Sequence, residues 1–402
     1  MTAQASPVPP RERINAVDAL RGFALFGVLA INLNTEFRVT FFEQFRFVRL
    51  GRLDSAAQAV LSLGFEFKAI ALFSLLFGAG LAIQFDRLAE NPRRMTLLVR
   101  RLLVLLAFGL IHLFLIWNGD ILTEYALAGL LVLPFLYAPA SLSLAAATLL
   151  FLLYLFMGKL PLPFSFPDAA WISRHIAEAR EVYGHGTLGE VALFRIAEVP
   201  ALATFLAYVF FRTVALMLFG AWVWRTGLLR QLGQRAAWLR SWGAALIATG
   251  LLLSLEQYGF LSLAKSWAAA ESLIVGTAPV VLALGYAALL LGFSGWSRIQ
   301  PLFRQLGAVG RMAFTNYIAQ SIVMTVLFYG FGFGLMGRVG VAAGLGLSTL
   351  IFSAQAWGSG WWLKRYRFGP LEWLWRCLMY GAWQPWKKPA GMASAAAAGA
   401  LP

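Results

Sequence analysis

The chain contains a single cysteine, Cys377, and only three histidines, His112, His175 and His185. One cysteine excludes an intramolecular disulfide and a cysteine-based metal site, and scattered histidines do not favour a histidine site. We therefore predict no metal centre and no permanently bound cofactor. The sequence also has no Walker A loop, dinucleotide glycine fingerprint, HExxH or G-x-S-x-G motif. These absences remove the common nucleotide-binding, zinc-protease and hydrolase folds from consideration.

Charged residues are also scarce, at 13% of the chain, while hydrophobic residues make up 60%. Soluble proteins have about 25% and about 45–50%, respectively. This excess indicates a lipid solvent, so we predict that the 402 residues form one polytopic membrane bundle. The net charge of +15 comes largely from arginines in short runs between apolar segments, as in cytoplasmic loops. Since no DNA- or RNA-binding signature accompanies them, we predict no nucleic-acid partner.

Apolar segments of a length that can cross a bilayer recur along the chain. We predict an all-α polytopic transmembrane helix bundle of about ten spans, at residues 19–33, 57–85, 97–117, 121–137, 142–158, 205–224, 238–255, 273–293, 312–335 and 339–363. We expect the first segment to be retained rather than cleaved as a signal peptide, because it is long, contains Asn32 and lacks a small-x-small cleavage pattern.

Arginine-rich loops predict that both termini are cytoplasmic. In that orientation the inner loops and tail contain Arg87, Arg93, Arg94, Arg100 and Arg101; Arg225, Arg230, Arg235 and Arg240; Arg298, Arg304 and Arg311; and Lys364, Arg365 and Arg367. The loop with Arg38, Arg46, Arg49 and Arg52 opposes this assignment, and four regions outweigh one. The predicted location is the bacterial cytoplasmic (inner) membrane, with the lipid bilayer as a partner and a homo-oligomer as an option.

The chain is predicted to form one integral-membrane domain over residues 1–390. Residues 159–204 are an extracytoplasmic amphipathic insertion rather than a span, since they contain Pro161, Pro163, Pro167 and Pro200 and a polar run. The Ala- and Gly-rich tail, residues 391–402, is predicted to be disordered.

Polar side chains within a bilayer are functional candidates. On the predicted topology, side chains from five segments fall in the outer half of the membrane, and these are Asn32, Glu66, Lys68, His112, Asp120, Glu124 and Arg212. Asp120 and Glu124 are four residues apart and share a helical face. This convergence predicts a single site below the outer surface.

His112 is the candidate general base, because its ordinary pKa near 6.5 suits proton transfer at neutral pH. Asp120 or Glu124 could orient it or hold its proton. The alternative is a histidine that only hydrogen-bonds a neighbouring helix. Arg212 requires either a carboxylate, such as Glu66 or Asp120, or a ligand anion.

The remaining polar candidates each have a structural alternative. Glu66 and Lys68 are two residues apart and cannot face each other, so they need partners on other helices or lie at the interface, where Lys68 can snorkel. Asn316 and Gln320 join helices or line an inward path.

Two further patterns lie on the first two spans. Arg21, three residues after Asp18, forms a helix-surface ion pair or contacts a phosphate-bearing donor. The spacing of Ser74, Gly78 and Ala82 predicts close helix packing.

The chain resembles the bacterial YeiB-like family of membrane proteins, which have a C-terminal domain of unknown function that would cover residues 205–390. The resemblance lies in Asp18–Leu25, Leu72–Gly80, His112–Trp117 with Gly119–Leu122, Tyr125 and Ala126, Gly310–Ala313 with Thr315–Tyr317, and Gly369–Trp373. It covers nearly the whole chain.

The first span also looks like that of the transmembrane acyltransferases, which include sugar O-acetyltransferases and heparan-α-glucosaminide N-acetyltransferase. Where the O-acetyltransferases have a histidine after the first-span Arg-Gly, this chain has Asn32, as in the heparan enzyme's branch. No histidine lies between Asn32 and Glu66, so His112 would have to act as the base from another helix.

Three functions are compatible with these observations. The first is acyl transfer from cytoplasmic acyl-CoA to an extracytoplasmic hydroxyl or amine on a sugar or lipid, with His112 and Asp120 as catalytic residues, Asn32 at the oxyanion and Arg21 at the donor. The acceptor site would include Glu66, Lys68, Trp117, Glu124, Arg212, Asn316 and Gln320. The second function is transport or export of a small solute through the same residues, and the third is a membrane scaffold.

Overall fold

The computed structural model describes all residues except 1–14, 46–49, 158–166, 229–234, 260–267 and 389–402. Within the described part the chain is helical, with no β-strand and one isolated bridge between Tyr366 and Lys387. The α-helices are α1 (Asn15–Asn32), α2 (Arg52–Gly64), α3 (Lys68–Arg87), α4 (Arg94–Ile111), α5 (Leu122–Val132), α6 (Ala140–Phe156), α7 (Ala169–His185), α8 (Leu188–Arg225), α9 (Ala236–Gln257), α10 (Ala268–Phe293), α11 (Gln300–Arg311), α12 (Ala313–Phe328), α13 (Val341–Arg365) and α14 (Pro370–Tyr380). Short π-helical and 3-10 segments interrupt or extend them at Leu33–Phe37, Phe41–Phe45, His112–Ile116, Leu133–Leu136 and Ser297–Ile299.

The prediction of a polytopic bundle is confirmed. Seven described segments are long and apolar enough to cross a membrane, and three shorter apolar helices accompany them. The seven are Asn15–Phe37, Arg52–Arg87, Arg94–Ile116, Phe205–Arg225, Ala236–Gln257, Glu271–Phe293 and Val341–Arg365, and the shorter three are Leu122–Leu136, Ala140–Phe156 and Ala313–Phe328. Each of the ten predicted spans overlaps one of these segments.

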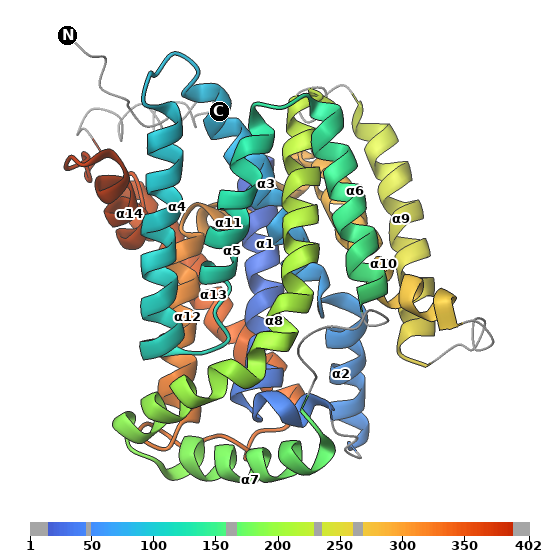
Figure 1. The fold of residues 1–402 in the computed structure, drawn as a ribbon, viewed down its shortest axis with the longest axis vertical. Helices are drawn as coiled ribbons and strands as arrows, with labels where there is room; N and C mark the ends of the chain where they lie inside the picture. Colours follow the sequence, from blue (N-terminus) through green and yellow to red (C-terminus); the bar gives the residue numbers. More distant parts are fainter. Residues whose placement is uncertain (1–14, 46–49, 158–166, 229–234, 260–267, 389–402) are drawn as a thin grey trace.

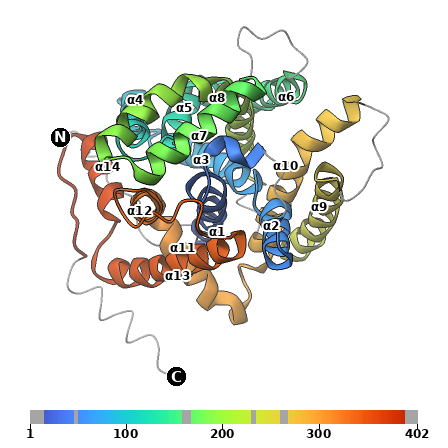
Figure 2. The same ribbon diagram turned by 90° about the horizontal axis from the view of Figure 1, so that it is seen from below.

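Helix α1 lies in the middle of the bundle (Figures 1 and 2) and packs against α3, α10, α11, α12 and α13. Its apolar residues Leu20, Leu25 and Leu29 are almost completely buried. Around this centre, α6 and α5 pack against α8, and α9 and α10 form a hairpin that contacts α3. The first span is therefore surrounded by protein rather than lipid, which allows it to carry polar side chains.

Two boundaries differ from the sequence prediction. The predicted second span is divided into α2 and α3 by residues 65–67, where Phe67 has a positive φ of 60°. That conformation is strained for a residue with a large side chain. The predicted insertion and sixth span share one continuous helix, α8, with Pro200 inside it, because one proline removes a single backbone hydrogen bond without ending a long helix that is packed along its length. The start of the insertion and the predicted disordered tail, residues 391–402, lie outside the described residues.

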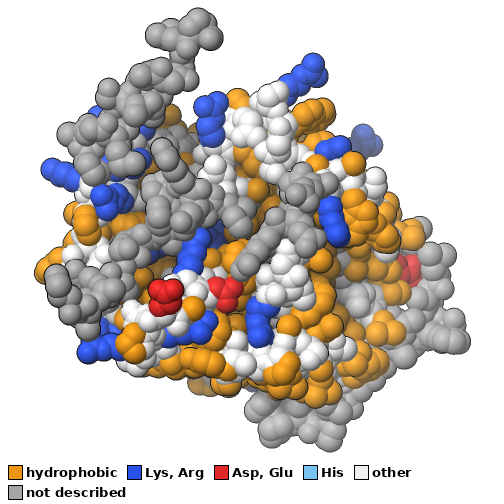
Figure 3. Space-filling model, turned by 90° about the horizontal axis from the view of Figure 1, so that it is seen from above, with side chains coloured by type: hydrophobic (Ala, Val, Ile, Leu, Met, Phe, Trp, Pro, Cys, Tyr) orange, Lys and Arg blue, Asp and Glu red, His pale blue; other side chains and the backbone are white. Residues whose placement is uncertain are grey.

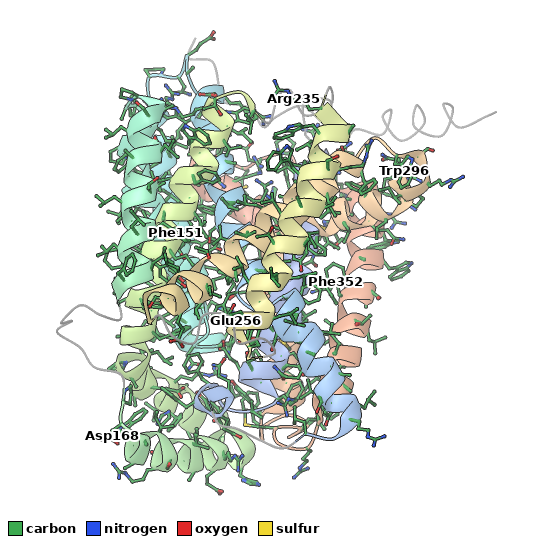
Figure 4. The ribbon with its side chains drawn as sticks, turned by 90° about the vertical axis from the view of Figure 1, so that its right-hand side faces the viewer. Phe151, Asp168, Arg235, Glu256, Trp296 and Phe352 are labelled. Carbon is green, nitrogen blue, oxygen red and sulfur yellow. The ribbon has the colours of Figure 1, made fainter. Side chains whose placement is uncertain are left out.

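Helix α7 and the first turns of α8 cover one end of the bundle (Figure 1). Asp168 caps α7 by accepting a hydrogen bond from the Trp171 backbone N–H at 2.7 Å, and Thr187 and Glu190 form a capping box at the start of α8. Figure 4 shows Asp168 at this end and Arg235, which precedes α9, at the opposite end. The helices thus create a closed end beneath which a site can lie.

Candidate functional site

His112 and Asp120 form a buried pair at the junction of α4 and α5. The Nδ1 atom of His112 lies 2.8 Å from Oδ1 of Asp120, and neither side chain is exposed. When Nδ1 carries the proton, its N–H donates a hydrogen bond to the carboxylate, and Nε2 keeps its lone pair. Since Nε2 has no hydrogen-bond partner in the described structure, the geometry leaves it available as a base.

Asp120 is held in place by the start of α5. Its Oδ1 and Oδ2 atoms accept backbone N–H groups from Leu122 at 3.1 Å and Thr123 at 2.7 Å. The N-terminus of a helix stabilises a negative charge through these free N–H groups. Asp120 therefore both caps α5 and orients the imidazole.

The turn before Asp120 depends on Gly119. A Cβ atom at this position would overlap the Trp117 ring and the Glu36 carboxylate, which approach the glycine from two sides. Trp117 also contacts the His112 ring edge-on, with 6.1 Å between the ring centroids. The glycine thus lets an aromatic ring and a carboxylate approach the same point beside the His112–Asp120 pair.

An outer cavity of about 90 Å³ of water-accessible volume lies between this turn and the end covered by α7. Its polar lining comes from several distant segments and comprises Asn32, Glu36, Asn118, Asp120, Glu124, Tyr183, Glu198, Arg212 and Tyr329. Trp117, Phe41, Phe67 and Phe205 add aromatic walls. Of the predicted site residues, Asn32, Trp117, Asp120, Glu124 and Arg212 therefore meet at one cavity, although His112 itself does not line it.

Arg212 is buried in the wall of the outer cavity, with 2% of its surface exposed. Its Nε and Nη2 atoms have no hydrogen-bond partner, and it forms no ion pair among the described residues. Neither of the considered salt bridges, to Glu66 or Asp120, is present. Its guanidinium group lies 5.6 Å from the Phe67 ring centroid and 5.7 Å from that of Tyr154, and it interacts through its charge with Glu124. Because its Nε and Nη2 atoms still lack acceptors and buried charges need hydrogen bonds, a contact to a ligand is the remaining interpretation of Arg212.

Two carboxylates of the outer cavity were not among the predicted site residues. Glu198 accepts hydrogen bonds from Tyr183 Oη at 2.7 Å and from Asn118, and its Oε1 lies 2.7 Å from His175 Nε2. Glu36 lies in the π-helical extension of α1. Sequence reasoning placed Glu36 in an outer loop and Glu198 in the insertion. The available signal was the step of four from Asn32 to Glu36, which puts both on one helical face.

A second, inner cavity of about 320 Å³ lies on the other side of the His112 pair. It contains Arg21, the predicted donor residue, whose Nη1 atom bonds Asp18 at 3.1 Å. Its wall also includes Ile121, which lines the outer cavity as well, and Tyr317. The Tyr317 ring centroid is 5.1 Å from that of His112. His112 therefore lies between Trp117 of the outer cavity and Tyr317 of the inner one.

Five predicted site residues line neither cavity: His112, which lies between the two, and Glu66, Lys68, Asn316 and Gln320, which lie elsewhere. Lys68 is completely buried and donates to the Ser62 carbonyl oxygen at 2.6 Å, while Glu66 accepts a hydrogen bond from Tyr258 Oη at 2.8 Å. These two residues thus fasten the α2–α3 break rather than contact the cavity, and Lys68 does not snorkel. The alternative prediction placed Glu66 and Lys68 at the membrane interface. In the structure, the break between α2 and α3 leaves the Ser62 carbonyl of α2 free to accept the hydrogen bond from Lys68.

Asn316 and Gln320 join α12 to α13. The Asn316 amide donates to Ser359 Oγ at 3.0 Å, and the Gln320 amide donates to Gln355 Oε1 at 2.7 Å. In this position they act as interhelical contacts, which was one of the two alternatives for them.

The fold and its buried polar centre define a multi-pass helical membrane protein. The chain belongs to the family that includes YxaH and YeiB. It is 35% identical to the uncharacterized protein YxaH of Bacillus subtilis over 94% of this chain and 97% of the relative. It is 29% identical to the uncharacterized protein YeiB of Escherichia coli over 93% and 98%. An uncharacterized 39.9 kDa protein from Bacillus acidopullulyticus is 30% identical over 93% and 96%.

Residues 223–382 match a family described as a protein of unknown function (DUF418). No solved structure matches the chain. The family assignment therefore confirms the resemblance found in the sequence.

Proposed function

We propose that the protein is an acyltransferase of the bacterial inner membrane that moves an acyl group from cytoplasmic acyl-CoA to an extracytoplasmic hydroxyl or amine on a sugar or lipid. The observation that carries this proposal is the position of His112 between two cavities. Trp117 of the outer cavity and Tyr317 of the inner cavity both contact its ring. A group transfer across a membrane needs a base where a donor from one side meets an acceptor from the other.

The hydrogen bond of the His112–Asp120 pair supports the following reaction. His112 Nε2 takes the proton from the acceptor, whose oxygen or nitrogen attacks the thioester carbonyl carbon. The new C–O or C–N bond forms, the C–S bond breaks, and the imidazolium returns the proton to the departing CoA thiolate. Asp120, bonded to Nδ1 at 2.8 Å, stabilises the imidazolium and fixes the tautomer.

The outer cavity is suited to an acceptor rich in hydrogen-bond donors. Its lining has four carboxylates, Glu36, Asp120, Glu124 and Glu198, and one arginine, Arg212. Carboxylates accept hydrogen bonds from hydroxyl and ammonium groups, and aromatic walls pack against the apolar faces of sugars. Asn32 and Arg212 can donate to the oxyanion, where one donor contributes roughly 3–4 kcal/mol.

The test supplies acetyl-CoA with a labelled acetyl group to inside-out membrane vesicles that contain the protein. We expect label in a lipid or glycan fraction together with free CoA. Transfer should fall about 10²–10⁴-fold in His112→Ala and in Asp120→Asn. Asparagine retains a good N-cap for α5, so Asp120→Asn should keep the folded protein while it loses the imidazole orientation. Arg174→Gln, an exposed change on α7, is the control.

The alternative is a transporter, which also requires cavities on both sides of a partition. Flux of a solute into vesicles without a covalent product would support it. Release of free CoA only at the rate of vesicles lacking the protein would overturn the acyltransferase proposal.

A further inference from the structure

The inner cavity concentrates positive charge. Five arginines from five different helices line it, namely Arg21 of α1, Arg87 of α3, Arg101 of α4, Arg311 of α11 and Arg376 of α14. The same wall contains two carboxylates, Asp18 and Glu372. Figure 3, a view onto this end of the bundle, shows Lys and Arg side chains in excess of Asp and Glu on the visible surface.

Both carboxylates already have partners. Asp18 bonds Arg21 at 3.1 Å. Glu372 caps α12, since its Oε1 accepts the backbone N–H groups of Phe314 at 2.8 Å and Thr315 at 3.1 Å, and its Oε2 accepts the Thr315 hydroxyl at 2.5 Å. Each carboxylate also interacts through its charge with one further arginine, Asp18 with Arg311 and Glu372 with Arg376. Two carboxylates cannot balance the charge of five arginines, so the cavity keeps an excess of positive charge.

Arg101, Arg311 and Arg376 form no ion pair among the described residues. Arg101 lies over the Trp375 ring at 4.6 Å and donates to Gln84, and Arg376 lies over the Phe368 ring at 4.5 Å. The Nε atom of Arg311 is buried without a partner. Burial lowers the pKa of the Arg311 and Arg376 guanidinium groups below their ordinary value, the direction that an anion in the cavity would reverse.

The cavity changes from cationic to apolar along its length. On α1 the lining passes from Arg21 to Leu25, and on α4 it passes from Arg101 to Leu105, one helical turn nearer to His112 in each case. Ile121 and Tyr317 close the apolar end. The shape fits a ligand with anionic groups at one end and an uncharged arm that points toward His112.

We propose that Arg101, Arg311 and Arg376 bind the phosphate groups of an organic phosphate that enters the inner cavity with its uncharged arm toward Tyr317. Guanidinium groups match phosphate oxygens with paired N–H donors. The identification of the ligand as the CoA donor rests on the proposed function. The anion site itself is inferred from the residues of the inner cavity and does not depend on that function.

The experiment measures binding to the purified full chain in phosphatidylcholine nanodiscs by calorimetry and thermal shift. The probes are CoA and pantetheine, which lacks the phosphate groups. We expect CoA to bind and raise Tm, with affinity that falls as salt rises, and pantetheine to bind at least tenfold more weakly. Arg101→Gln and Arg376→Gln should each weaken CoA binding at least tenfold.

Arg100→Gln is the matched control, because Arg100 neighbours Arg101 on α4 and does not line the cavity. Arg101→Lys should recover part of the binding, which separates lost charge from lost folding. Equal binding of CoA and pantetheine, no binding of either, or unchanged CoA binding in Arg101→Gln and Arg376→Gln would overturn the proposal.

A lipid headgroup carries the same phosphate chemistry. In phosphatidylglycerol nanodiscs, competition with CoA that Arg101→Gln abolishes would support the same arginines with a lipid as the phosphate source. The outcome also separates the two proposals. CoA binding without acyl transfer would support the anion site and contradict the acyltransferase proposal. Normal transfer kinetics in Arg101→Gln and Arg376→Gln would support the acyltransferase and contradict the anion site.

Discussion

One hydrogen bond decides which nitrogen of His112 is left free for the proposed role as a base. Because Nδ1 is bonded to Asp120 at 2.8 Å, the second nitrogen alone is left without a partner. The carboxylate in turn is fixed by two backbone N–H groups at the start of α5. At this scale, the site is a chain of three fixed groups, from helix terminus to carboxylate to imidazole, and each limits the freedom of the next.

Another residue pair, Glu43 and Arg180, lies outside the membrane spans and gives a pH-dependent stability. Arg180 donates to both oxygens of Glu43, with Nε at 3.0 Å and Nη2 at 2.5 Å. Burial opposes ionisation of Glu43, but the hydrogen bonds from Arg180 and Thr40 outweigh it, so its pKa lies below the ordinary 4.5. The ionised pair therefore stabilises the fold above about pH 4.5, and this contribution is lost as the pH falls through the lowered pKa.

We expect Glu43→Gln to lower stability by about 0.5–1 kcal/mol at pH 7 and to differ progressively less from the wild type as the pH falls below the ordinary pKa of 4.5. Thermal unfolding in detergent across this pH range measures the difference. Glu178→Gln on the exposed face of α7 should follow the wild type at every pH. A gap between Glu43→Gln and wild type that widens toward low pH would contradict the assignment.

At the scale of helices, interruptions of regular structure surround the outer cavity. Helix α1 continues as the π-helical segment Leu33–Phe37, α4 continues as His112–Ile116, and α2 and α3 separate at Phe67. Wider π turns and breaks redirect side chains that an uninterrupted helix would turn elsewhere. They bring Glu36, Trp117 and Phe67 to one cavity from three different helices.

Of the small residues Ser74, Gly78 and Ala82, Gly78 lies where α3 packs closely on α8, as the sequence predicted, while Ser74 bonds Tyr125 of α5. A Cβ at Gly78 would overlap the backbone of Met217. We expect Gly78→Ala to lower the free energy of unfolding by about 1–3 kcal/mol, because two backbones must separate. Gly346→Ala, on α13 with nothing within 4 Å of the added Cβ, should be neutral or stabilising by up to about 1 kcal/mol. Equal Tm values for both variants would refute the packing argument.

At the scale of the whole molecule, the distribution of charge and the positions of the two cavities indicate the same orientation in the membrane. The connection between α3 and α4, with Arg93 and Arg94, lies at one end of the bundle, and α7 lies at the other (Figure 1). The inner cavity with its five arginines belongs to the first end, and the outer cavity lies toward α7. The positive-inside rule predicts that the first end faces the cytoplasm.

This orientation predicts a labelling pattern. In a Cys377→Ser background, a cysteine at exposed Arg174 of α7 should react with a membrane-impermeant maleimide in intact cells whose outer layers are permeable to it. A cysteine at exposed Arg93 should react only after the inner membrane is opened. The reverse pattern would invert the topology, and with it the donor and acceptor sides of the proposed reaction.

The sequence alone determined the class of fold and part of the lining of one cavity. Hydrophobic length gave the spans, since a bilayer requires about 20 apolar residues for each helix. Depth along the predicted spans brought Asn32, Asp120, Glu124 and Arg212 to one place. These predictions depend only on distance along a helix, and that distance can be calculated from the number of residues between two positions.

Only the tertiary structure decided what each polar group contacts. Lys68 and Glu66 have the same depth as the site but face Ser62 and Tyr258, because the break at Phe67 rotates the chain there. Glu36 and Glu198 join the outer cavity, and Arg101, Arg311 and Arg376 gather at the inner one. The rotation of each helix about its axis and the choice of neighbours arise from side-chain packing between distant segments, and no local pattern in a sequence records them.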